Sequence, residues 1–128
     1  MSTIVLSSPP DVAPASSYEH ASRAGDFIYV AGQVARDGAG NNVGKGDMRA
    51  QIEQVGENIK DALESVGASL DDIVRTTTYV TDIDEYFKHA DVRLRYFGKA
   101  IPTSTTVEVR RLASPDNLVE IEAFALTD

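Results

Sequence analysis

One long segment with helical periodicity constrains the fold of this chain most. Its apolar residues recur at three- and four-residue steps: Ile52, Val55, Ile59, Leu63 and Val66. This spacing is typical of an amphipathic helix with one buried face. Asp47 is suited to the N-cap, and Gly67 to the stop after the last turn. We therefore predict a helix of about 19 residues that starts at Asp47 and covers another layer of structure.

The segments around this helix favour β-strands and one further helix. Residues 27–34 and 73–80 are rich in β-branched and aromatic residues, and a glycine-rich loop at 38–46 separates the first of them from the helix. Further strands are expected at residues 3–6, 19–23, 103–112 and 118–126, and a second helix at 84–97 with an apolar stripe of Phe87, Ala90, Leu94 and Phe97. This order predicts an α+β fold in which two helices cover one face of a single mixed β-sheet.

Length and composition narrow the function classes. A chain of 128 residues favours one domain over residues 1–128, large enough for a core without metals or disulfides. The sequence contains no Cys, which excludes a thiol nucleophile and thiolate metal sites. With 12 Lys and Arg against 20 Asp and Glu, the net charge of −8 disfavours nucleic-acid binding. Because neither a signal peptide nor a membrane-spanning run is evident, we expect a cytoplasmic protein without membrane contact.

The last strand alternates between two kinds of side chain. One set is aliphatic and is expected beneath the helices: Val119, Ile121, Ala123 and Ala125. The other set mixes carboxylates with large apolar groups: Glu120, Glu122, Phe124 and Leu126. In the preceding strand we group Ser104 and Thr106 with this second face, opposite Val107. Such a mixed face favours a subunit interface that contains a polar cleft, with a wholly solvated sheet as the alternative.

Short motifs along almost the whole chain resemble the RidA (YjgF/UK-type) family of small trimeric proteins. The matching segments are Ser-Ser-Tyr-Glu-His-Ala around Tyr18, Val-Ala-Gly-Gln at 30–33, the end of the long helix at 66–67, residues 72–80, Tyr-Phe at 96–97, Pro-Thr-Ser-Thr-Thr-Val-Glu-Val at 102–109, and Val-Glu-Ile-Glu-Ala at 119–123. Each fragment alone is weakly specific, and their common order carries the resemblance.

The resemblance implies a chorismate-mutase-like fold and a homotrimer that packs its open sheet faces together. It also implies hydrolysis of reactive enamines or imines, without a cofactor, in a cleft between subunits. On this basis Glu120 matches the residue that orients or activates the attacking water. Gly32 matches a backbone group that lines the cleft, and Tyr18 a residue at its mouth. We expect Ser104 and Thr106 to line the same cleft and contact the substrate.

One position departs from the family pattern. The family deaminases carry an arginine that grips the substrate carboxylate, and this chain has Ser104 there. An asparagine that is usual on the second helix corresponds to Ala90. This departure predicts an altered substrate range, with a preference for a neutral or cationic ligand. Another arginine could replace the lost one, and the sequence leaves the choice open among Arg36, Arg93, Arg95 and Arg23 of a neighbouring subunit.

Three functions remain open from the sequence. The first is an imine or enamine hydrolase that depends on Glu120, and the second is a trimer that binds a small molecule without catalysis. The third, an endoribonuclease or translation inhibitor, is disfavoured by the acidic composition. The two histidines, His20 and His89, do not have the spacing of metal ligands, so we expect no metal site.

Overall fold

The six strands of the computed structural model, which describes residues 4–9, 11–15 and 17–128, form one mixed sheet. They are β1 (Ile4–Ser7), β2 (Ala21–Ala24), β3 (Phe27–Gln33), β4 (Ile73–Val80), β5 (Thr103–Glu108) and β6 (Val119–Leu126). Their order in the sheet is β1-β2-β3-β6-β4-β5, and only β4 and β5 pair in parallel. The predicted single mixed sheet is confirmed, while Thr3 of the first expected strand lies outside the described residues.

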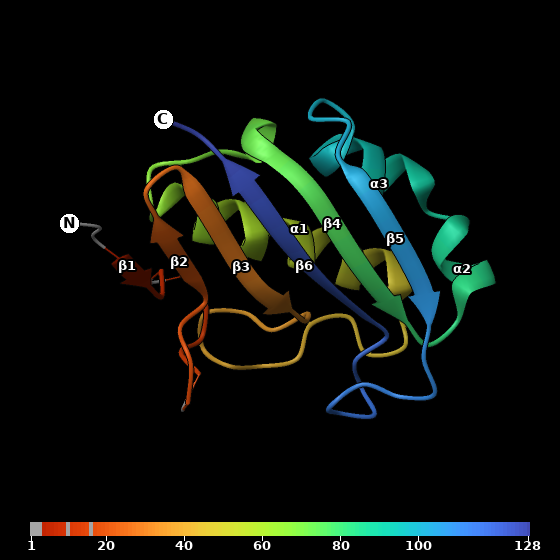
Figure 1. Cartoon of the computed structure of the whole chain (residues 1–128). Helices are drawn as coiled ribbons and strands as arrows, with labels where there is room; N and C mark the ends of the chain where they lie inside the picture. Colours follow the sequence, from red (N-terminus) through yellow and green to blue (C-terminus); the bar gives the residue numbers. More distant parts are fainter. Residues whose placement is uncertain (1–3, 10, 16) are drawn as a thin grey trace.

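The helices lie together on one face of this sheet (Figure 1). The long helix α1 (Met48–Glu64) begins where predicted, because the Asp47 side chain accepts a hydrogen bond from the amide of Ala50. Gly67 follows the helix with φ at +83°, a conformation that glycine adopts at little cost. The apolar face of α1 packs on β3 and β6 and forms the centre of the core with Ile28, Val30, Ile121 and Ala123.

The second expected helix is two shorter ones, α2 (Ile83–Phe87) and α3 (Ala90–Phe97). The backbone leaves the helical region at His89, where ψ is 33°. The predicted apolar stripe is wrong except at Phe97, since Phe87 and Leu94 are 57% and 60% exposed. Tyr86 and Val92 are buried instead. The break rotates α3 relative to α2. Residues spaced for one continuous helix therefore do not share a buried face.

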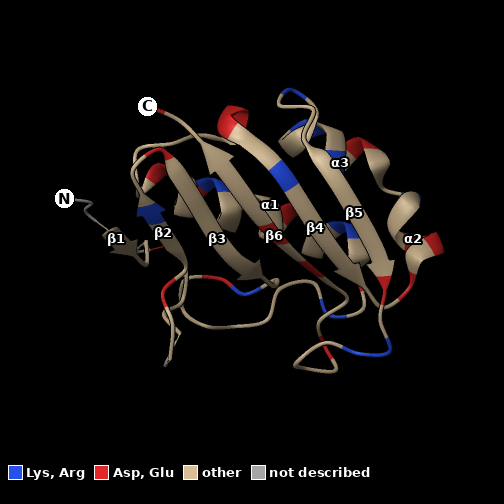
Figure 2. Cartoon of the chain, viewed as in Figure 1, with Lys and Arg blue, Asp and Glu red and all other residues tan. Residues whose placement is uncertain are grey.

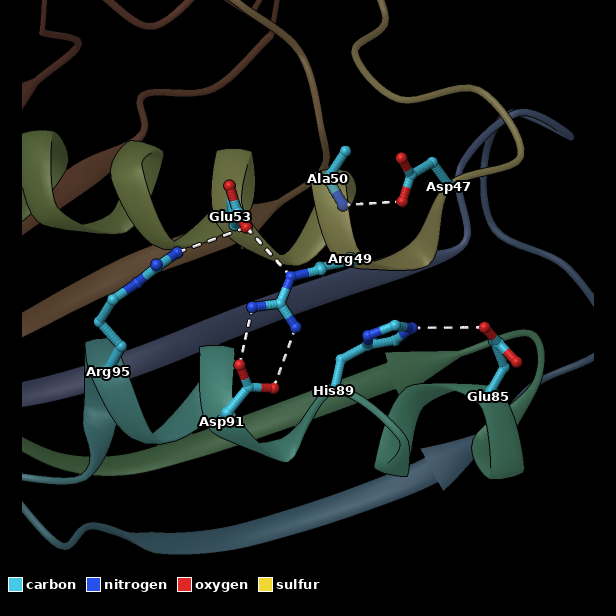
Figure 3. A network of polar contacts seen from close by, with 8 residues as sticks. All are labelled: Asp47, Arg49, Ala50, Glu53, Glu85, His89, Asp91 and Arg95. Carbon is cyan, nitrogen blue, oxygen red and sulfur yellow. Dashed lines mark hydrogen bonds and ion pairs between the residues drawn. The ribbon is translucent and has the colours of Figure 1, made fainter.

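A network of charged side chains joins α3 to α1 (Figure 3). Arg49 donates to both carboxylate oxygens of Asp91, at 3.0 and 2.7 Å. Glu53 lies 3.6 Å from Arg49 and 3.5 Å from Arg95. These groups are largely exposed, and exposed ion pairs contribute about 0–1 kcal/mol each. The network therefore orients α3 more than it stabilises the fold.

The opposite face of the sheet carries no helix in the described part of the chain (Figure 1). Strand register places large, partly exposed apolar side chains on it, from three strands: Ile4, Leu6, Phe27, Tyr29, Phe124 and Leu126. The predicted alternation of β6 is confirmed, with Val119, Ile121, Ala123 and Ala125 buried under the helices. We call this uncovered side of the sheet the open face.

Strand β5 differs from its prediction in two ways. It ends at Glu108 rather than at residue 112. Its faces are also reversed, because Ser104 pairs with Thr76, and Thr76 pairs with Ala123 on the helix side of β6. Thr106 lies on the same side as Ser104, because it pairs with Thr78, which is buried. Ser104 and Thr106 therefore lie on the helix side of the sheet, and their assignment to the face of Glu120 is wrong.

Charged side chains are spread over loops and helices, with lysines and arginines interspersed among acidic residues (Figure 2). The strands themselves are mostly uncharged. Among the described helices none is both long enough and apolar enough to cross a membrane.

Candidate functional site

A pocket of about 410 Å³ opens beside the end of β3 and the start of β6. Two loops form its walls, one after β3 and one before β6. Its lining combines small, polar and charged residues: Tyr18, Gly32, Val34, Arg36, Gly40, Asn42, Ala113, Ser114, Asp116, Asn117 and Glu120. The structure thus brings together three of the five predicted site residues, Tyr18, Gly32 and Glu120. A volume of this order holds a small metabolite-sized ligand.

Gly32 permits the carboxylate of Glu120 to lie directly against the backbone of β3. A β-carbon added at Gly32 would lie 2.6 Å from Oε2 of Glu120 and 2.9 Å from Cδ. Distances this short are sterically forbidden, so only glycine fits beside the carboxylate in this arrangement. The register of β3 against β6 shifts between Val30 and Gln33, and this irregularity lies at the same point. The bulge and the glycine together position Glu120 in the pocket.

Glu120 has an environment that favours proton exchange. Burial, and secondarily the charge of Glu122, raise the pKa of Glu120 above its ordinary value. Glu122 accepts a hydrogen bond of 3.1 Å from the hydroxyl of Tyr79 on β4. A carboxylate with a raised pKa can accept a proton from water and return it to a substrate near neutral pH. Of the two glutamates, only Glu120 lines the pocket.

A buried histidine holds the segment that carries Tyr18. The Nδ1 atom of His20 accepts a hydrogen bond of 3.0 Å from Nε2 of Gln33. The proton of the ring is therefore assigned to Nε2, which lies 2.6 Å from the backbone oxygen of Ala13. The ring of Tyr18 packs edge-on against this imidazole, with 5.8 Å between centroids. His20 thus links Ala13 to Gln33 of β3 and packs against Tyr18, which lines the pocket.

Two buried amides of α1 hold the pocket walls. Gln51 donates to the backbone oxygen of Asp116 at 2.8 Å and accepts from the amide of Leu118 at 2.8 Å. Asn58 donates to the backbone oxygens of Val34 and Arg36, at 3.2 and 2.9 Å. Sequence analysis missed both positioning residues. The available signal was a pair of amides on the helix face that packs against the core, because a buried amide requires hydrogen-bond partners.

The other two predicted site residues lie elsewhere. Ser104 accepts a hydrogen bond of 2.9 Å from Nη2 of Arg93 on α3 and lies 3.4 Å from the hydroxyl of buried Thr76. Neither Ser104 nor Thr106 lines the pocket of Glu120. The physical reason is the register described above, which directs both side chains to the helix side. Within one chain, these residues and Glu120 cannot contact the same small ligand.

The charged groups of the pocket are few. Arg36 and Glu120 contribute opposite formal charges, and Asp116 lies 3.8 Å from Nζ of Lys45. Asn117 is 5% exposed, and its Oδ1 makes no hydrogen bond to any described residue. Across the described ranges, no three His, Asp or Glu side chains gather as a metal site would require. The arrangement is suited to binding a small polar molecule and to proton transfer by a carboxylate.

Known proteins resemble this chain over most of its length. A family model described as Endoribonuclease L-PSP matches residues 9–127. A RutC family protein of Pyrococcus horikoshii is 42% identical over 112 residues, which is 88% of both chains. A 2-iminobutanoate/2-iminopropanoate deaminase of Dermatophagoides farinae is 27% identical and spans 97% of this chain and 96% of its own length.

A solved structure agrees with these sequence matches. The crystal structure of a Mycobacterium tuberculosis member of the YjgF/YER057c/UK114 family superimposes with a TM-score of 0.83 at 36% identity. The match covers 98% of this chain and 100% of the other. Sequence and fold lead to the same assignment, and this chain belongs to the RidA/YjgF family.

Proposed function

We propose that this protein hydrolyses a small reactive imine or enamine, with Glu120 as the catalytic residue. The observation that carries the proposal is the carboxylate of Glu120, half-buried against Gly32 in a pocket of about 410 Å³. The family assignment supports the proposal, since one relative over nearly the full length is named an imine deaminase.

The reaction requires one water and one residue that moves protons. Glu120 accepts a proton from a water molecule as the water oxygen bonds to the carbon of the C=N group. The nitrogen takes up a proton, and a carbinolamine forms. Its C–N bond then breaks, which releases ammonia and leaves a carbonyl compound. An enamine enters the same route after its carbon is protonated. A carboxylate with a raised pKa is suited to both proton transfers.

We propose further that the protein works as a homotrimer joined through its open faces. The apolar side chains of this face, such as Tyr29 and Phe124, are 45% and 41% exposed in a single chain. Contiguous exposed apolar surface favours association. The cleft is then shared, and we expect β5, at the edge of the sheet, to bring Ser104 and Thr106 of one subunit toward Glu120 of another. The altered substrate range expected from Ser104 belongs to this shared cleft.

The decisive experiment measures ammonia release from several freshly generated imines. We expect Glu120→Gln to lower kcat by about 100-fold or more, the usual contribution of a general acid-base group. The matched control is Glu122→Gln, which is two residues along the same face but outside the pocket. If Glu120→Gln has no effect on ammonia release, or if no imine is hydrolysed, the proposal is wrong.

The substitution Ser104→Arg distinguishes the non-catalytic alternative. Ser104 in place of the family arginine favours a trimer that binds a ligand without turnover. If Ser104→Arg restores deamination to an inactive wild type, only the carboxylate anchor is missing. The ribonuclease function named in the family description has less support, because a net charge of −8 repels phosphate backbones.

A further inference from the structure

Tyr18 lines the pocket without support from regular secondary structure. The described residues between β1 and β2, which include Tyr18, form neither helix nor strand. The side chain of Tyr18 is 54% exposed, so core packing does not fix its ring. The aromatic ring that packs against it is that of His20, with 5.8 Å between centroids and 76° between the ring planes. The contacts that fix His20 therefore bear directly on the orientation of Tyr18.

The backbone of His20 is attached to β3. Its backbone oxygen accepts a hydrogen bond of 2.9 Å from the amide of Ala31. The next residue, Ala21, is the first of β2 and pairs with Val30 of β3. The chain is thus anchored to the sheet at His20, and Tyr18 lies two positions before this anchor.

The imidazole of His20 is held as closely as its backbone. The residue is 6% exposed, and both ring nitrogens have partners, Gln33 at 3.0 Å and the backbone oxygen of Ala13 at 2.6 Å. Nε2 of Gln33 also donates to the backbone oxygen of Ala31 at 3.0 Å, which sets the orientation of the amide. The ring cannot rotate without losing two hydrogen bonds, so it presents a fixed surface to Tyr18.

His20 lies close to the pocket of Glu120 but outside its lining. A cavity of about 20 Å³ is lined in part by Tyr18, His20 and Gly32. Tyr18 and Gly32 also line the larger pocket, whereas His20 does not. Any influence of His20 on a ligand in that pocket must therefore pass through a neighbour. Tyr18 is the lining residue whose ring packs on the imidazole.

We propose that His20 is a positioning residue that sets the affinity of the pocket for its substrate by holding the ring of Tyr18 in the lining. The effect on substrate rests on the proposed function, whereas the order of the Tyr18 ring does not. An edge-to-face pair favours one orientation of the ring. A side chain already held in its bound orientation loses less freedom when a ligand binds. Loss of the pair should weaken binding and leave the chemistry at Glu120 intact.

The first test compares His20→Gln with the wild type in the full-length protein. Glutamine offers an acceptor and a donor to Gln33 and Ala13 but no ring to Tyr18, so it separates the hydrogen bonds from the aromatic contact. We expect KM for the imine that the wild type hydrolyses best to rise about 2- to 10-fold, the effect of one lost aromatic pair. The value of kcat should change by less than about twofold, because the lost interaction is one of binding. The matched control is His89→Gln, which alters the other histidine, bonded to Glu85 on the helix side, and should leave both constants unchanged.

A double-variant cycle tests whether the effect passes through Tyr18. Tyr18→Ala removes the ring that His20 contacts, and the exposure of Tyr18 makes the fold insensitive to this change. We expect His20→Gln to raise KM in the wild type but not in the Tyr18→Ala background. If His20→Gln raises KM by the same factor in both backgrounds, His20 does not act through Tyr18 and the proposal is wrong.

NMR of labelled tyrosine separates this inference from the proposed function, because it requires no turnover. Tyr18→Phe identifies the signals of Tyr18 among those of the five tyrosines. We expect a nuclear Overhauser effect between the Tyr18 ring and the imidazole in the wild type, and a more mobile Tyr18 ring in His20→Gln with Tyr29 unchanged. If no imine is hydrolysed but the Tyr18 ring loses its order in His20→Gln, the positioning role stands and the catalytic proposal fails. If the wild type shows no contact between the two rings, or if His20→Gln leaves the mobility of Tyr18 unchanged, the positioning role is wrong.

Discussion

At the scale of single residues, the contact between Gly32 and Glu120 is the feature on which the site depends. Glycine is required here for close approach, because any side chain would occupy the space of the carboxylate. This requirement links a backbone position in β3 to a side chain in β6. The two are 88 positions apart in sequence (120 minus 32) and adjacent in the pocket.

We expect Gly32→Ala to displace the Glu120 carboxylate and lower activity, with a loss of stability under about 1 kcal/mol, because the clash falls on the end of a flexible side chain. Urea unfolding would measure the stability and ammonia release the activity. The double variant Gly32→Ala with Glu120→Ala removes the clash, so most of the lost stability should return. If Gly32→Ala destabilises the wild type and the Glu120→Ala variant equally, the predicted contact between Gly32 and Glu120 is wrong.

The raised pKa of Glu120 predicts how stability changes with pH. A carboxyl group whose pKa is higher in the folded than in the unfolded state binds its proton more tightly when folded. Its stabilising contribution is present below the ordinary value of 4.5 and is lost as the pH rises through the raised pKa. Glu120→Gln should therefore be more stable than wild type at pH 7–8, and this advantage should shrink on acidification toward pH 4.5. A stability difference that does not depend on pH would refute this explanation.

At the scale of elements, α1 both covers the core and holds the pocket. Its apolar residues pack on β3 and β6, while Gln51 and Asn58 on the same buried face bind the backbone of the two wall loops. One helix thus couples the stability of the core to the shape of the site. Loops that a helix holds in this way are less free to move than loops that contact only solvent.

We expect Gln51→Met to destabilise the protein by about 1–3 kcal/mol, because it leaves partly buried backbone groups at Gly44, Asp116 and Leu118 without partners. Hydrogen exchange of residues 113–118 should accelerate more than exchange in β4. The control is Gln54→Met on the same helix, which loses one hydrogen bond to Asn58 and should cost under about 1.5 kcal/mol. Unchanged exchange in the 113–118 loop would show that Gln51 does not hold this wall.

At the scale of the whole molecule, the sheet has one covered and one open face. The open face presents large apolar side chains from β1, β3 and β6, and it continues along β6 toward Glu120. Association through this face would bury the apolar residues and bring other subunits close to the pocket. The fold and the proposed site would then be completed by assembly.

We expect wild-type protein to sediment with three times the mass of one chain, and Phe124→Glu to shift it toward monomer. The substituted side chain is already partly exposed in the single chain, so its fold should survive, as circular dichroism can verify. The matched control is Phe87→Glu on α2, on the helix side of the molecule. If Phe87→Glu dissociates the protein and Phe124→Glu does not, the subunits associate through the helix side rather than the open face.

Local patterns in the sequence were sufficient to predict the elements with strong signals. The apolar period and the Asp47 cap specify α1, and strict alternation in β6 separates its buried residues from Glu120. The family motifs indicated Tyr18, Gly32 and Glu120, which the pocket brings together. Local patterns could not predict the face of Ser104, the break at His89 or the position of Arg36 beside the pocket. Alternation within a strand is relative, so the face of β5 depends on pairings through β4 and β6 that no local pattern records.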